Sequence, residues 1–273
     1  MSDSPYYEEM RPPADLSPWI AALWQIRGAA DSALPAHRVL PDGCADILVD
    51  VGAWSRSGGR IASASLVGPM TRALVAPLAP SADMFGIRFR PGVVGSLSAG
   101  NARDLQNLAV PLADAGLDLP VDIERLFVQT SLQDRAQLVL PWIRRRLADG
   151  PAPDRAVAAA IDAWTRAARA DRPLLSVAQV ACLGGVTERS LERRFSAWAG
   201  YAPAQFRRLT RFRAGLRAFA AGSQSWVQVA LQCGYADQAH LSRDFREFAS
   251  TTATGWASEA VVGIVQDPAI AAL

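Results

Sequence analysis

Two patterns of hydrophobic and polar residues divide the chain. In residues 1–115, short apolar runs are separated by turns rich in Gly and Pro. Pro41-Asp42-Gly43 precedes the run Ile47–Val51, and Phe85–Phe89 is followed by Pro91-Gly92. Short runs with such punctuation are typical of β-strands. The pattern predicts a β-rich N-terminal domain over residues 1–115, either a cupin-like barrel or a sandwich.

From Val121 onward the apolar residues recur at helical spacing. Leucines and Ile143 follow this spacing over Leu126–Leu147, and the breaker sequence Asp149–Pro153 then interrupts it. We therefore expect a helical connector and hinge over residues 116–153, an all-α domain over 154–256 and a C-terminal tail over 257–273. The expected fold class is α+β multidomain.

The helical part contains an internal repeat. Two S-x-x-Q sequences, each able to form a capping box at a helix start, begin at Ser176 and Ser225, 49 residues apart. Each opens a short helix that ends at a glycine and is followed by a capping residue and a second helix. The glycines are Gly185 and Gly234, and the capping residues are Thr187 and Asp237.

The second helix of each copy carries the same apolar stripe. Its members are spaced by four and then three residues, the period of a core-facing helix face: Leu191, Phe195 and Trp198, then Leu241, Phe245 and Phe248. Between the copies a longer stripe, Phe206 to Phe219, follows Pro203, a residue favoured at helix starts. The pattern predicts two helix-turn-helix units joined by one long helix.

The polar faces of the two second helices suit base recognition. Arginine pairs with guanine, glutamine with adenine, and a carboxylate accepts from cytosine in the major groove. The candidate DNA-binding residues are Arg189, Ser190, Glu192, Arg193, Gln238, Ala239, His240, Ser242 and Arg243. One polar helix face is usually only solvated, but two copies with matching caps, turns and stripes favour a DNA-reading role.

Charge supports a polyanionic partner for this part of the chain. Between Leu174 and Gly255 there are 10 Arg and 5 acidic residues, a net charge of +5, while the rest of the chain carries −3. No apolar run approaches the length of a membrane span, and the N-terminus lacks the pattern of a signal peptide. We expect a cytoplasmic protein without membrane contact, with free thiols at its three cysteines. Cys182 and Cys233 are expected to be small core residues.

The sequences ERSLERRFSAWAGYAPAQFRRLTRFRAG (188–215) and VALQCGYADQAHLSRDFREF (229–248) resemble the DNA-binding domain of the AraC/XylS family of transcriptional regulators. LPDGCADILV and FGIRFRPG are similar to the β-rich sensor domain of one branch of that family. The resemblance implies two reading helices in successive major-groove segments of promoter or operator DNA, and an N-terminal domain that binds an effector, self-associates, or both. A homodimer and RNA polymerase are further candidate partners of such a regulator, which would act as an activator or as a repressor.

One departure from the family pattern concerns the end of the second unit. Gly200–Phe206 matches the family sequence G-x-x-P-x-x-[FY], whereas Ser250–Trp256 has neither its glycine nor its proline. We therefore expect an altered closing helix after the second unit.

The N-terminal half offers candidates for effector binding. Arg88 and Arg90 alternate with Ile87 and Phe89, so on a strand both arginines share one face. If that face points inward, they would pair with an anionic effector group; if outward, they are surface charge. Trp24, His37 and Cys44 are further candidates for lining such a site, or plain core and turn residues.

Two alternatives to an effector-controlled regulator remain. One is a DNA-binding regulator without an effector, controlled by a protein partner or by expression level. The other is a cupin-like enzyme fused to a DNA-binding domain. The chain has only two histidines, in different halves, and no phosphate-binding loop or nucleophile motif. We therefore expect no enzymatic activity, no metal and no cofactor.

Overall fold

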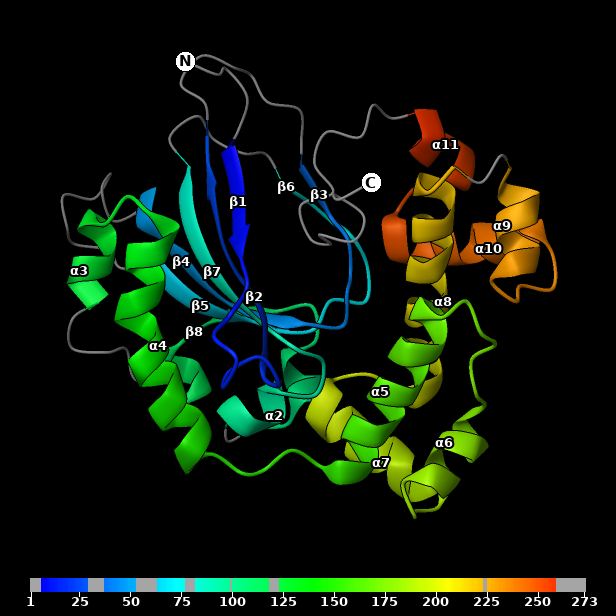
Figure 1. The fold of residues 1–273 in the computed structure, drawn as a ribbon, viewed down its shortest axis with the longest axis horizontal. Coiled ribbons are helices and arrows are strands. Elements are labelled where there is room, and N and C mark those ends of the chain that lie inside the picture. Colours follow the sequence, from blue (N-terminus) through cyan, green and yellow to red (C-terminus); the bar gives the residue numbers. More distant parts are fainter. Residues whose placement is uncertain are drawn as a thin grey trace.

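A computed structural model describes residues 6–28, 37–52, 63–76, 82–98, 100–117, 123–222 and 225–258. Figure 1 shows a sheet with flanking helices on one side and an array of helices on the other. The first half of the chain is β-rich and the second is helical, as the hydrophobic pattern predicts.

The main sheet is antiparallel and has six described strands in the order β1-β2-β7-β4-β5-β8. A separate pair, β3 and β6, forms a second small sheet. The strands are β1 (Tyr6–Met10), β2 (Ile20–Arg27), β3 (His37–Val39), β4 (Ala45–Asp50), β5 (Ser63–Val67), β6 (Leu74–Ala76), β7 (Asp83–Phe89) and β8 (Ala109–Pro111).

Alternation along β7 gives the main sheet two different faces. Phe85, Ile87 and Phe89 lie in a hydrophobic core that also contains α2 (Val94–Leu97), α3 (Ile123–Val128) and α4 (Leu132–Asp149). Short 3₁₀ turns, η1 (Ala102–Leu105) and η2 (Ala113–Ala115), lie near the last strand. The opposite face of β7 carries Arg88.

Helix α4 is part of the N-terminal core, although its sequence suggested a connector. Its stripe of Val139, Ile143 and Leu147 is buried in the same cluster as the strands. Arg135, fully buried on this helix, donates two hydrogen bonds of 2.7 Å to Asp83 on β7. Helix α4 packs here because the apolar face of the sheet would otherwise be exposed to water. We propose that the N-terminal unit extends to residue 149 and that the linker is 150–154.

The helical half has a core of its own, rich in aromatic residues. Trp164, Phe195 and Phe206 contact one another in its first part. In its second part Phe212 and Trp226 each contact Phe245. The elements are α5 (Arg155–Arg169), α6 (Val177–Leu183), α7 (Glu188–Ala199), α8 (Pro203–Ala220), α9 (Trp226–Gln232), α10 (Gln238–Asp244), the π-helical turn η3 (Phe245–Ala249) and α11 (Ala253–Ser258).

The caps and turns of the two helix-turn-helix units lie where the repeat places them. Ser176 and Gln179 form a reciprocal capping box, and Ser225 accepts from the backbone N–H of Gln228. Gly185 and Gly234 have φ of 65° and 71°, the left-handed region that glycine tolerates best. Thr187 and Asp237 accept backbone hydrogen bonds at the starts of α7 and α10. Helix α8 joins the two units.

The second unit ends with the same kind of backbone turn as the first, but at a different residue type. Gly200 after α7 and Ser250 after η3 both take the left-handed conformation, with φ of 75° and 54°. Helix α11 still forms without the proline, and Trp256 is buried against Phe245. The altered sequence therefore retains a closing helix. The turn before that helix places a serine, Ser250, in a backbone conformation that favours glycine.

Candidate nucleic-acid interface

Helix α7 separates an exposed polar face from a buried apolar one. Arg189, Glu192 and Arg193 are exposed, while Leu191 and Phe195 are fully buried. Ser190 is half-buried, and its hydroxyl accepts a hydrogen bond of 3.2 Å from Nε of Arg194. Ser190 is thus hydrogen-bonded to another residue of the same helix. The exposed face of α7 is formed by the three charged side chains.

Helix α10 repeats this arrangement. Gln238, Ala239 and Arg243 are exposed, His240 and Ser242 are half-buried, and Leu241 is fully buried. All nine sequence-predicted DNA-binding residues therefore lie on α7 or α10, and none of them belongs to the hydrophobic core.

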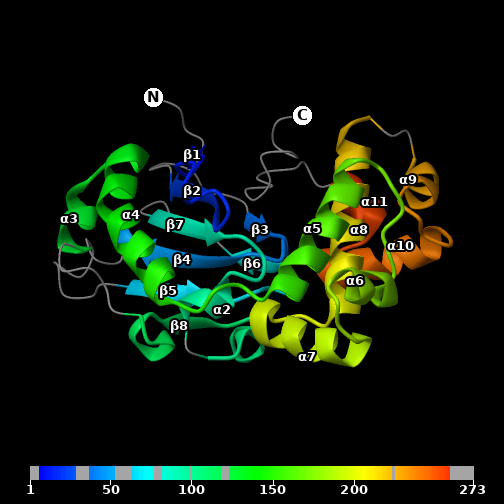
Figure 2. The same cartoon turned by 60° about the horizontal axis from the view of Figure 1, so that its bottom comes forward.

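Trp198 does not lie wholly in the core as its stripe predicted. It is half-buried, and its ring also lies against Gly95 of α2 in the N-terminal half. Figures 1 and 2 both show α2 beside α7. The C-terminal end of α7 thus contacts the sheet-bearing half.

A buried carboxylate at the C-terminal end of α10 is the main feature that sequence reasoning missed. Asp244 is fully buried and accepts hydrogen bonds from Arg208 at 2.6 Å, from Arg211 at 3.4 Å and from the hydroxyl of Tyr235 at 3.0 Å. Burial, first, and then the Asp244 charge raise the pKa of Tyr235 far above its ordinary value. The available signal was an acidic residue among the apolar positions Leu241, Phe245 and Phe248.

His240 belongs to the same network. Its Nε2 lies 3.0 Å from Nη2 of Arg211, and its ring meets the ring of Tyr235 edge-on. Arg211 in turn lies 4.1 Å from the centre of the Tyr235 ring. Helix α10 is therefore held against α8 by polar contacts as well as by its apolar stripe.

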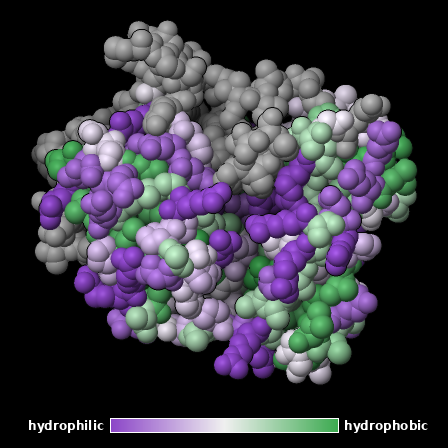
Figure 3. Space-filling view, in the orientation of Figure 1, coloured by the Kyte–Doolittle hydropathy of each residue, from purple (hydrophilic) through white to green (hydrophobic). Residues whose placement is uncertain are grey.

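The two halves of the chain are joined by several hydrogen bonds. The hydroxyl of Tyr201 donates to the carbonyl of Met70, and Gln106 donates to the carbonyl of Gly200 at 2.6 Å. Nη1 of Arg213 on α8 donates to the carbonyl of Asp42 at 3.1 Å, and Arg38 donates to the carbonyl of Ala249. Figure 3 shows hydrophilic residues gathered near this junction on the face in view. Both helix-turn-helix units thus contact the N-terminal half.

Arg88 and Arg90 lie in different environments. Arg88 points inward and is buried within 3.6 Å of Glu9 and Asp42 and 3.5 Å of Asp46. Strand β7 ends at Phe89, so Arg90 lies beyond it, exposed, with Nε donating to the carbonyl of Ser17 at 2.6 Å. Arg90 therefore lies just outside the strand on which the two arginines were expected to share a face.

The other effector candidates only partly gather around Arg88. Trp24 lies across Gly86, donates to Asp46 at 2.8 Å and has its ring centre 6.0 Å from the Arg88 guanidinium. Burial raises the pKa of the Cys44 thiol well above its ordinary value. The side chain of His37 lies outside the described residues. Three carboxylates already surround Arg88, so the cluster does not favour an anionic ligand.

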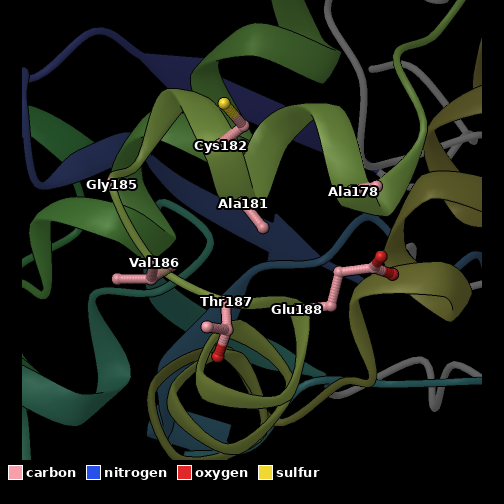
Figure 4. Close-up of a pocket in the computed structure, with 7 residues that line it drawn as sticks. All are labelled: Ala178, Ala181, Cys182, Gly185, Val186, Thr187 and Glu188. Carbon is pink, nitrogen blue, oxygen red and sulfur yellow. The ribbon is translucent and has the colours of Figure 1, made fainter.

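A shallow pocket of about 400 Å³ lies at the turn of the first unit (Figure 4). It is lined by Ala178, Ala181, Cys182, Gly185, Val186, Thr187 and Glu188. The depression exists because the α6 side chains that line it are small. Cys182 is exposed there, rather than buried in the core as expected. Cys233 is half-buried against the core. Within the described ranges, no group of three or more His, Cys, Asp or Glu side chains is arranged to hold a metal ion, and no helix is long and apolar enough to cross a membrane.

Comparisons with known proteins agree with this geometry. A helix-turn-helix domain family model matches residues 180–259, and a domain of unknown function (DUF6597) matches residues 8–111. No curated protein matches the chain. The C-terminal domain is thus a helix-turn-helix domain of the AraC type, the class that DNA-binding transcriptional regulators carry.

Three solved structures illustrate what this chain is similar to. One is a transcriptional regulator with an AraC-type DNA-binding domain from Chromobacterium violaceum, 27% identical over 40% of this chain and 95% of that chain, with a TM-score of 0.36. Another is the DNA-binding domain of AdpA in complex with a target DNA, 21% identical over 36% and 88%, with a TM-score of 0.33. A third is ToxT from Vibrio cholerae, 9% identical over 93% and 97%, with a TM-score of 0.42.

Proposed function

We propose that the chain controls transcription by placing α7 and α10 in successive major-groove segments on one face of operator DNA. The observation that carries this is the pair of outward polar faces on two equivalent helices, both anchored to α8. Reading helices of this kind lie one helical turn of DNA apart, roughly 34 Å. Arg193 and Arg243 are exposed at repeat-equivalent positions and are proposed to read guanine.

The test begins with selection of binding sites from a random duplex library. Arg193→Ala and Arg243→Ala should each weaken binding to the selected site by about 1–3 kcal/mol and relax preference at one base position, in different half-sites. A uniform loss over all sequences would mean that these arginines contact only phosphate. Arg166→Ala, on the exposed face of α5 and paired with Asp162, is the control and should leave base preference unchanged.

Substitution of Glu192 tests the discrimination between bases rather than the affinity for DNA. A carboxylate repels phosphate, so its use at an interface is to accept from cytosine and to reject other bases. Glu192→Ala should therefore broaden the set of selected sites without weakening binding. Unchanged selectivity would show that Glu192 only faces solvent.

We further propose that the N-terminal half controls DNA binding, in response to a small effector. The support is a shared turn: Asp42 ion-pairs with Arg88 inside the sheet, while its carbonyl accepts from Arg213 on α8. Gly43 follows with φ of 83°, and a Cβ there would lie 2.6 Å from the Phe206 ring. A ligand that moved this turn would therefore also move the helix that joins both reading units.

An effector-independent regulator is the second candidate, favoured by the fact that the chain's own carboxylates already surround Arg88. A thermal-shift screen of metabolites on the full-length chain separates the two. A hit that changes operator affinity supports effector control. No hit, with equal operator binding in the presence and absence of cell extract, supports the second candidate. Self-association and contact with RNA polymerase remain predictions.

A further inference from the structure

His240 is hydrogen-bonded in a way that fixes where its proton lies. The guanidinium of Arg211 can only donate, so Nε2 of His240, 3.0 Å away, must accept. A neutral imidazole that accepts at Nε2 carries its hydrogen at Nδ1. No described residue hydrogen-bonds to Nδ1, so this N–H is left as a donor on the reading helix.

The surroundings also keep the ring neutral. The charged groups around it are Arg211 from α8, and Asp237, Arg243 and Asp244 from α10 and the turn before it; Tyr235 adds a titratable hydroxyl. Burial, first, and then the Arg211 charge lower the pKa of His240 below its ordinary value. Near pH 7 the ring is therefore uncharged and offers one donor in a known position.

Arg211 is itself held in place. It lies on the Tyr235 ring at 4.1 Å and donates to Asp244 at 3.4 Å, while Tyr235 donates to the same carboxylate at 3.0 Å. Only 13% of the Arg211 side chain is exposed. Most of the Arg211 side chain is therefore withheld from direct contact with DNA.

We propose that Arg211 is a positioning residue that sets His240 as the neutral Nδ1–H tautomer, so that the second reading helix donates to N7 of a purine. This inference rests on the proposed DNA-reading function. His240 is the third residue of α10, near the helix start that meets base edges in helix-turn-helix proteins. Purines offer N7 as an acceptor in the major groove, whereas cytosine offers only a donor there. His240 thus selects against cytosine at one position of the second half-site.

The tautomer is measured without DNA, by long-range ¹H–¹⁵N spectra of full-length protein labelled at histidine. The chain has two histidines, so a His37→Gln variant assigns the signals. We expect His240 to be protonated at Nδ1. Arg211→Gln should shift it toward the Nε2–H form and raise its pKa, while Arg246→Gln, which removes an exposed arginine of the same unit, should change neither. An Nε2–H tautomer in the unaltered protein would overturn the inference.

The base contact is measured with 7-deazapurines placed singly in the second half-site of a selected operator. The unaltered protein should lose about tenfold in affinity at one purine. His240→Ala and Arg211→Gln should be insensitive to that substitution, and Arg246→Gln should keep the tenfold loss. Retained sensitivity in His240→Ala would overturn the reading role. If no site can be selected at all, the proposed function fails, while the tautomer result stands independently.

Discussion

Ser250 is a serine in a backbone conformation that favours glycine. Its φ of 54° lies in the same left-handed region as the 75° of Gly200, 50 residues earlier in the first unit. A side chain in the left-handed region strains the backbone, so Ser250→Gly should raise the free energy of unfolding by roughly 1 kcal/mol, measured by urea denaturation. Gly200→Ser is the matched reverse change. It should destabilise more strongly, since a Cβ there would lie 2.9 Å from the Ala102 carbonyl and from Pro69.

Asp46 gives the N-terminal half a pH-dependent stability. Burial raises its pKa from 3.8 to about 6, against the opposing pull of Arg88. Because the folded pKa is above the unfolded one, the stability that the protonated carboxyl contributes is complete below pH 4 and is lost as the pH rises through 6. Asp46→Asn, which can still accept from Trp24, should therefore raise the unfolding free energy at pH 7.5 by about 1–3 kcal/mol and leave it unchanged at pH 4.

The control for Asp46 is a carboxylate with the opposite behaviour. Asp15 is exposed, and its hydrogen bond to Arg144 lowers its pKa. Asp15→Asn should give no gain in stability at pH 7.5. If both variants behaved alike, burial of the Asp46 charge would not be the cause of the pH dependence.

At the scale of elements, α10 and α8 are joined through Arg208, which bonds two carboxylates in different environments. Asp244 is fully buried, whereas the side chain of Glu247 is 42% exposed. Asp244→Ala leaves the Arg208 and Arg211 charges without their buried partner, so it should lower the free energy of unfolding by about 3 kcal/mol. Glu247→Ala removes only an exposed ion pair and should cost under about 1 kcal/mol. Hydrogen exchange of the α10 amides would measure both, and equal effects would contradict the proposed anchoring role of Asp244.

At the scale of the whole molecule, α2 and α7 approach closely because residue 95 is glycine. A Cβ there would lie 2.6 Å from the Trp198 ring, so Gly95→Ala should push the two halves apart, although alanine favours helices. We expect faster proteolysis at residues 151–153 and a larger radius of gyration in solution scattering. Gly100→Ala, whose Cβ would meet nothing nearer than 3.9 Å, is the control. Unchanged proteolysis in Gly95→Ala would show that this contact does not hold the halves together.

Local rules allowed much of the fold to be predicted from the sequence. Caps at Ser176 and Thr187, the left-handed turn at Gly185 and the stripe from Leu191 depend on residues within one or two helical turns of each other, so their spacing is visible in the chain. The duplication of the pattern then indicated two reading helices. Short apolar runs likewise predicted the β-rich first half.

Contacts between distant residues were decided only by the tertiary structure. The partners of Asp244 on α8 lie 33 and 36 residues before it, and Arg88 meets Glu9 from another strand. Helix α4 covers the sheet because that face is apolar, which its own periodicity does not reveal. Arg88 is buried because Glu9, Asp42 and Asp46 from other segments surround it, whereas Arg90 lies past the end of β7 and is exposed. Hydrophobic periodicity states which face of an element is buried, but the element that covers it, and the charge that meets a buried side chain, depend on how the whole chain packs.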